Sequence, residues 1–89
     1  MKNQAEKAAQ FQALHAAQEA FVIPNPWDIG SARLLALAGF KALATSSAGY
    51  AFSRGLPDNA VGRAQMMVHL AEIAHATDLP VSADLENGF

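Results

Sequence analysis

Three short runs rich in apolar residues constrain the fold of this chain more than any other feature. They occupy residues 21–23, 41–47 and 81–85 and are separated by segments with helical character. Residues 21–23 are apolar throughout, which is typical of a strand buried on both faces, and such strands belong to parallel sheets. Because successive parallel strands need helical crossovers, the pattern predicts an α/β architecture without an internal repeat or a dividing linker.

Two helices are predicted around the first apolar run. Residues 3–20 are rich in Ala, Gln, Glu and Lys, which are good helix formers, and carry only a thin apolar stripe. The second helix begins where Asp28 or Ser31 can cap it, and Gly39 stands where a glycine ends a helix.

A third helix is predicted over residues 63–76. Its apolar residues recur at helical spacing: Met66, Met67, Leu70, Ile73 and Ala74. His69 and His75 fall off this stripe and are six residues apart, so we do not expect them to share a metal ion.

The last run leads into Asp84 and Glu86, which are followed by an Asn-Gly turn signal. Residues i and i+2 of a strand share a face, so both carboxylates are expected to point the same way. A divalent cation between them would offset their repulsion, and Mg²⁺ commonly uses only one or two protein carboxylates. The alternative is that these are ordinary turn-forming and capping residues.

A polar segment, Thr-Ser-Ser-Ala-Gly at residues 45–49, ends the middle run. Its hydroxyl and backbone N–H groups can cradle a carboxylate or a phosphoryl group. A tight turn between a strand and a loop explains the same residues equally well. Residues 50–62 have no clear period and are expected to form a long loop, in which Arg54 and Asp58 either serve a site or are solvated.

Composition excludes several classes of function. The chain has 89 residues, 52% of them hydrophobic and 16% charged, with a net charge of −2 and no basic cluster, so we expect neither nucleic acid nor a membrane as a partner. It has no cysteine, and hence no disulfide or thiolate zinc site. No apolar run approaches the roughly 20 residues of a membrane span, and no secretory signal precedes the first run. We therefore expect a cytoplasmic protein.

Residues 21–89 resemble the isocitrate lyase/phosphoenolpyruvate mutase family, and most of all its phosphonomutase-type, carboxyvinyl-carboxyphosphonate phosphorylmutase-like branch. The segments that carry the resemblance are Pro24-Asn25-Pro26-Trp27-Asp28, Ser31-Ala32-Arg33-Leu34-Leu35, Ala38-Gly39-Phe40, Ala42-Leu43-Ala44-Thr45-Ser46-Ser47-Ala48-Gly49, Gly55-Leu56-Pro57-Asp58 and the closing stretch from Asp78 to Phe89.

The resemblance implies a TIM-type (β/α)8 barrel that binds Mg²⁺ or Mn²⁺ and makes or breaks a C–C or C–P bond. The substrate it implies is a small 2-oxo or 2-hydroxy carboxylate or a phosphonate. On this pattern Asp84 matches the aspartate that binds the metal, and Glu86 matches an acidic residue that holds it through water. Ser46, Ser47 and Ala48 match the segment that holds the substrate carboxylate, and Asp58 matches an aspartate on the mobile gating loop.

The chain is much shorter than such a barrel, which needs about 250 residues. We therefore expect a single incomplete domain over residues 1–89, with an amino-terminal helix over 1–20 and the first three strand units of the barrel over 21–89. The expected function is that of the amino-terminal part of a metal-dependent lyase or mutase, assembled as a homo-oligomer. The alternative is a catalytically inert fragment that is stable only in association with other chains.

Overall fold

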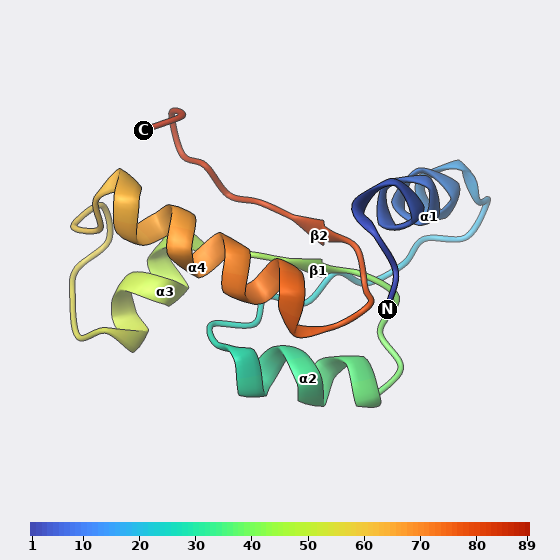
Figure 1. Cartoon of the computed structure of the whole chain (residues 1–89), viewed down its shortest axis with the longest axis horizontal. Helices are drawn as coiled ribbons and strands as arrows, with labels where there is room; N and C mark the ends of the chain where they lie inside the picture. Colours follow the sequence, from blue (N-terminus) through green and yellow to red (C-terminus); the bar gives the residue numbers. More distant parts are fainter.

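The computed structural model describes residues 1–89. Its elements in chain order are α1 (Gln4–Ala16), α2 (Ile29–Leu37), β1 (Leu43–Ala44), α3 (Ser47–Ser53), α4 (Arg63–Ala76) and β2 (Val81–Ser82). The two strands lie side by side, with α1 near their amino-terminal ends and α3 beyond the carboxyl end of β1 (Figure 1). None of the helices combines the length and the apolar composition that a membrane crossing requires.

The strands form a parallel pair in which Leu43 faces Val81 and Ala44 faces Ser82. The ladder continues beyond the assigned strands with a bond of 2.9 Å from the Thr45 N–H to the Ser82 carbonyl. Helix α4 is part of the crossover between the two strands (Figure 1). The predicted combination of helices with a parallel sheet is therefore confirmed.

The predicted first strand, residues 21–23, does not form. The chain does run beside β1 here, because the Ala44 N–H donates to the Pro24 carbonyl at 3.0 Å and the Asn25 side-chain amide donates to the Ala44 carbonyl at 3.0 Å. A longer ladder is blocked because Pro24 and Pro26 have no N–H to donate. The sheet consequently has two strands and not three.

The main core lies between α2, α4 and the two strands. Its residues are Ala32, Leu43, Ile73 and Ala76, with Ile29, Leu35, Leu79 and Val81 packed against them. The predicted apolar stripe of α4 was partly wrong, because Met67 is 52% exposed. On α2, Leu34 and Leu37 are 68% and 85% exposed and lie outside this core. The sheet is narrow, so each helix buries only a thin stripe against it.

A second apolar cluster lies beneath α3. It consists of Ala51, Val61 and Met66, with Tyr50, Leu56, Leu70 and Phe89 packed against it. The sequence had predicted a loop from residue 50 onward, but residues 50–53 belong to α3. This short helix therefore packs against Met66 and Leu70 of the predicted α4 stripe, and its Tyr50 also contacts His69, which had been placed off that stripe.

Helix α1 is anchored to the end of α4 by a buried lysine. Lys7 is 5% exposed, and its ammonium group donates to the carbonyls of Ala74 at 2.6 Å and Thr77 at 2.8 Å. These carbonyls belong to the last turn of α4, where the helix itself provides no donors. A positive charge is also favoured at this end of the helix dipole.

Helix α1 is shorter than predicted. It begins at the Asn3 cap, whose side chain accepts from the Glu6 N–H at 2.8 Å, and it ends at Ala16 instead of residue 20. The chain then turns so that the ring of Phe21 packs edge-on against His15, with centroids 5.3 Å apart.

Candidate functional site

Asp84 is the most highly connected polar residue at the carboxyl ends of the strands. Its Oδ2 accepts hydrogen bonds from the Ser47 N–H at 3.1 Å and the Ser47 hydroxyl at 3.0 Å. Its Oδ1 accepts from the Glu86 N–H at 3.0 Å, and its own N–H donates to Oγ1 of Thr45 at 2.8 Å. The start of α3 and the end of β2 are therefore joined through one carboxylate.

These donors stabilise the charged form of the carboxylate. The pKa of Asp84 is lowered below its ordinary value, first by the Ser47 backbone N–H, then by the Glu86 N–H and the Ser47 hydroxyl, while burial opposes the shift. Hydrogen bonds to a carboxylate favour its ionised form. Asp84 therefore carries a full negative charge at neutral pH.

Glu86 lies differently from the prediction. Strand β2 ends at Ser82, so the rule that alternate residues share a face does not extend to Glu86. Glu86 is exposed and has a φ of 52°, in a turn closed by a 2.7 Å bond from the Gly88 N–H to the Leu85 carbonyl. Its backbone N–H donates to Asp84, and its side chain is exposed to solvent.

The donor set here fits a hard cation that keeps most of its water. Mg²⁺ commonly binds through one or two carboxylates, and Asp84 provides an ionised one with Glu86 two residues away. No group of three or more His, Cys, Asp or Glu residues in this chain could enclose a metal ion. Tight binding by protein ligands alone is therefore not expected from these residues.

The serine segment begins α3 and lies against Asp84 at the carboxyl ends of the parallel strands. Ser46 is the N-cap of α3, and its hydroxyl oxygen accepts from the Gly49 N–H at 3.0 Å. Ser47 is 9% exposed and directs both of its donors at Asp84. The N–H of Ala48, in the first turn of α3, has no intrahelical partner.

Asp58 is not brought into contact with Asp84. It lies in an exposed turn after α3, where its carboxylate accepts a hydrogen bond of 2.9 Å from the Asn59 N–H. The same turn lies near the residues that follow Asp84, because Asn59, Glu86 and Asn87 line one pocket together. Asp58 is therefore next to a pocket that includes the second acidic residue.

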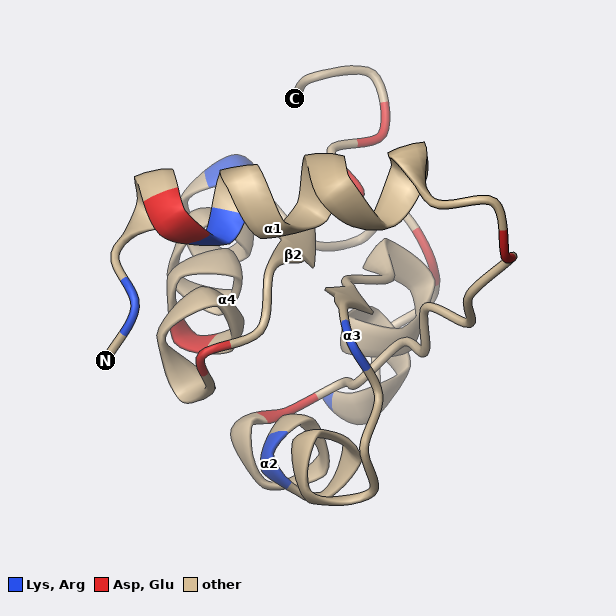
Figure 2. Cartoon of the chain, turned by 90° about the vertical axis from the view of Figure 1, so that its right-hand side faces the viewer, with Lys and Arg blue, Asp and Glu red and all other residues tan.

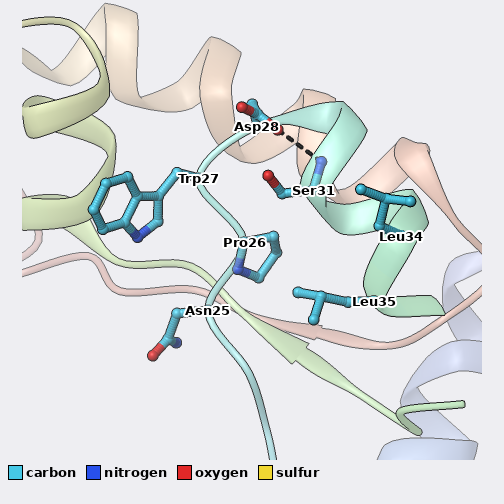
Figure 3. A pocket seen from close by; sticks show the side chains of 7 residues that line it. All are labelled: Asn25, Pro26, Trp27, Asp28, Ser31, Leu34 and Leu35. Carbon is cyan, nitrogen blue, oxygen red and sulfur yellow. Dashed lines mark hydrogen bonds between the residues drawn. The ribbon is translucent and has the colours of Figure 1, made fainter. Parts of the chain in front are cut away.

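Another pocket lies at the start of α2 and is shown in Figure 3. Its polar groups are engaged in structural contacts, since Asp28 accepts a 2.7 Å bond from the Ser31 N–H as the cap of α2. Trp27 points away from Leu34 and Leu35 (Figure 3) and packs on the backbone of Gly49. We assign this pocket to helix capping and packing.

His69 is a buried polar residue that the sequence pattern missed. It is 2% exposed, its ring stacks on that of Tyr50, and its Nε2 has no hydrogen-bond partner. Burial lowers its pKa, and the nearby charge of Glu72 opposes the shift. The prediction placed His69 off the apolar stripe because it did not include α3, which carries Tyr50 and covers this side of α4.

No separate role was predicted for Thr45 from the sequence. Thr45 is 5% exposed and accepts a hydrogen bond from the Asp84 N–H. The only sequence signal was its place at the head of the polar segment 45–49. Lys and Arg residues, by contrast, are dispersed over several elements (Figure 2).

Comparisons with known proteins agree on one family. The family model described as phosphoenolpyruvate phosphomutase matches residues 11–89. The 2-methylisocitrate lyase of Bacillus subtilis (strain 168) is 36% identical over 88 residues, which cover 98% of this chain and 29% of that protein. The 2-methylisocitrate lyase of Halalkalibacterium halodurans is 36% identical over 89 residues, covering 99% of this chain and 30% of that protein.

Solved structures show the same relationship. A Burkholderia cenocepacia J2315 protein described as a candidate lyase/mutase aligns with a TM-score of 0.94 and 65% identity over 97% of this chain and 31% of that one. The phosphoenolpyruvate phosphomutase of Streptomyces platensis subsp. rosaceus aligns with a TM-score of 0.82 and 32% identity over 88% of this chain and 28% of that one. The 89 residues thus span less than a third of the length of these relatives.

Proposed function

The chain belongs to the phosphoenolpyruvate phosphomutase family, and from this premise we propose that it forms part of the active site of a metal-dependent lyase or mutase. The reaction makes or breaks a C–C or C–P bond in a small 2-oxo or 2-hydroxy carboxylate or a phosphonate. Relatives are named as lyases of 2-methylisocitrate and 2,3-dimethylmalate and as a phosphomutase of phosphoenolpyruvate. These three names supply the substrates to be tried first.

The contact between Ser47 and Asp84 is the observation that carries this proposal. Two hydrogen bonds, of 3.1 and 3.0 Å, hold an ionised carboxylate against the start of α3, at the carboxyl ends of both strands. In barrels built from parallel strands, active sites lie at this end of the sheet. A carboxylate fixed there by neighbouring donors is in the right place to hold a cation.

Asp84 is the proposed protein ligand of Mg²⁺ or Mn²⁺, with Glu86 acting through a water molecule. When bound, the metal ion would stabilise negative charge that develops on an enolate-like oxygen of the substrate. Asp84 contributes the charge that holds the ion, and its bonds to Ser47 and Glu86 keep it ionised.

The start of α3 is the proposed site for the substrate carboxylate. The Ala48 N–H needs an acceptor, and the Ser46 hydroxyl proton remains available while its oxygen accepts from Gly49. Ser47 stands between these two groups, and Asp58 is proposed to close over the substrate from its turn. Such fixed donors would orient the carboxylate without reorganisation.

The test is a titration of the chain with Mn²⁺ as the probe, together with assays of Mg²⁺-dependent turnover of the three named substrates. Asp84→Ala is expected to abolish Mn²⁺ binding, and Glu86→Gln to weaken it. The matched control is Glu19→Gln, because Glu19 is an exposed carboxylate that is distant in sequence from Asp84. Unchanged Mn²⁺ affinity in Asp84→Ala would show that the assignment of the metal site is wrong.

A further inference from the structure

Just beyond the ends of β1 and β2, side-chain oxygens replace the backbone carbonyls as acceptors of the interstrand hydrogen bonds. If the register continued, Thr45 would lie opposite Ala83, and the Asp84 N–H would donate to the Thr45 carbonyl. It donates instead to Oγ1 of Thr45, at 2.8 Å. The next ladder bond would run from the Ser47 N–H to the Asp84 carbonyl, and the Ser47 N–H donates instead to Oδ2 of Asp84, at 3.1 Å.

We propose that Thr45 and Ser47 are positioning residues that fix both the backbone and the carboxylate of Asp84 for metal binding. The inference rests on the proposed function and extends it to two residues that do not themselves touch the metal. Thr45 holds the Asp84 backbone through one bond, and Ser47 holds the carboxylate through two. Thr45 is 5% exposed and Ser47 is 9% exposed, so water cannot easily replace either.

The arrangement also selects one oxygen of the carboxylate. An ionised carboxylate has about four acceptor sites, two on each oxygen. Oδ2 accepts two hydrogen bonds from Ser47, whereas Oδ1 accepts one from the Glu86 N–H. The remaining site is on Oδ1, so a cation would bind Asp84 through that oxygen.

This assignment changes the role of Ser47. The resemblance had matched it to the segment that holds the substrate carboxylate, but both of its donors are directed at Asp84. Its neighbours Ser46 and Ala48 are then left to hold the substrate. Ser47 acts on the reaction through Asp84.

The experiment measures the affinity of the chain for Mn²⁺ by electron paramagnetic resonance in Thr45→Val, Thr45→Ser and Ser47→Ala. Loss of a residue that orients a metal ligand typically weakens binding by about 10- to 100-fold. We expect a weakening in this range for Thr45→Val, a smaller one for Ser47→Ala, which keeps its N–H, and nearly full affinity for Thr45→Ser, which keeps its hydroxyl.

Ser53→Ala is the control, because the Ser53 hydroxyl lies on α3 and donates to the Tyr50 carbonyl, away from Asp84. Thermal unfolding without metal separates stability from binding, since a merely structural role would lower the unfolding temperature and leave the Mn²⁺ affinity of the folded protein intact.

Wild-type Mn²⁺ affinity in Thr45→Val, or equal weakening in Thr45→Val and Thr45→Ser, would overturn the inference while leaving Asp84 as the ligand. If Thr45→Val does not fold, Ser47→Ala decides the matter, and unchanged affinity in that variant overturns the inference. If the unaltered chain binds no Mn²⁺ at all, both this inference and the proposed metal site are wrong.

Discussion

The imidazole ring of His69 lies against the phenol ring of Tyr50, with the two centroids 3.9 Å apart and the planes inclined by 19°. This stack joins α3 to α4 and places a titratable ring in the interior. Since Nε2 has no acceptor within the protein, protonation would bury a charged N–H without a partner. The α3–α4 contact therefore depends on a neutral His69.

The first prediction is that the protein loses stability on mild acidification. Burial lowers the pKa of His69 in the folded state below its ordinary value of 6.5. The unfolded chain then binds the proton more readily, so this contribution is complete above pH 6.5 and is lost as the pH falls through the folded pKa. Urea unfolding at several pH values between 8 and 5 measures it.

His69→Phe keeps the stacked ring but cannot titrate, and should flatten this pH dependence. His75→Gln, which changes an exposed histidine on the same helix, should leave it unchanged. Asp28 and Asp84 do not interfere, because their pKa values are lowered from 3.8 and the stability that they contribute is lost only at lower pH. A free energy of unfolding in His69→Phe that still falls as steeply as in the wild type would contradict the prediction.

The second prediction concerns Lys7. Replacing it with Met should destabilise the protein by about 1–3 kcal/mol, because the Ala74 and Thr77 carbonyls lose their donor. Lys41→Met removes an exposed lysine and is the control. Chemical denaturation of both variants provides the comparison, and equal free energies of unfolding would mean that Lys7 is not an anchor.

The third prediction concerns Gly49. A Cβ at this position would clash with the indole ring of Trp27, so Gly49→Ala must displace that ring. We expect a loss of about 1–3 kcal/mol of stability, as is usual for overpacking. Gly30→Ala is the matched control, because its nearest neighbour would be 3.7 Å away. The double variant Trp27→Ala/Gly49→Ala should show no further loss beyond Trp27→Ala alone, and additive losses would refute the contact.

The fourth prediction concerns the outer face of α2. Leu34 and Leu37 are 68% and 85% exposed, which favours burial against another copy of the chain. Light scattering after gel filtration should therefore detect a homo-oligomer, and Leu37→Lys should shift it toward the monomer. Phe52→Lys, on α3, is the comparison variant. A wild-type monomer at all concentrations tested would rule out this interface.

Features with local causes were predicted well from the sequence. The bounds of α4 at residues 63 and 76 agree with the prediction because its apolar period is regular, and α2 begins after Asp28 because that side chain caps it. The resemblance led to Asp84 and the serine segment, and the structure places these in contact. Their roles in binding metal and substrate remain predictions.

Features that depend on tertiary contacts were missed. Helix α3 has no apolar period and is held by the contacts of Tyr50 with His69 and of Gly49 with Trp27, all distant in sequence. Residues 21–23 look like a buried strand, but the prolines that follow prevent a ladder. Thr45 was overlooked because a hydroxyl at the end of a strand gives no sign of which neighbouring backbone group it will accept from.

The anchoring of α1 implies an order of assembly. The two carbonyls that receive the Lys7 ammonium group are 67 and 70 residues further along the chain. They converge on one point only when the last turn of α4 has formed, so closing this contact means closing loops that span most of the 89 residues. During synthesis α1 leaves the ribosome before α4, yet it must wait for α4 before it can dock. Of the four helices described, α1 is made first and can dock through Lys7 only after the fourth has formed.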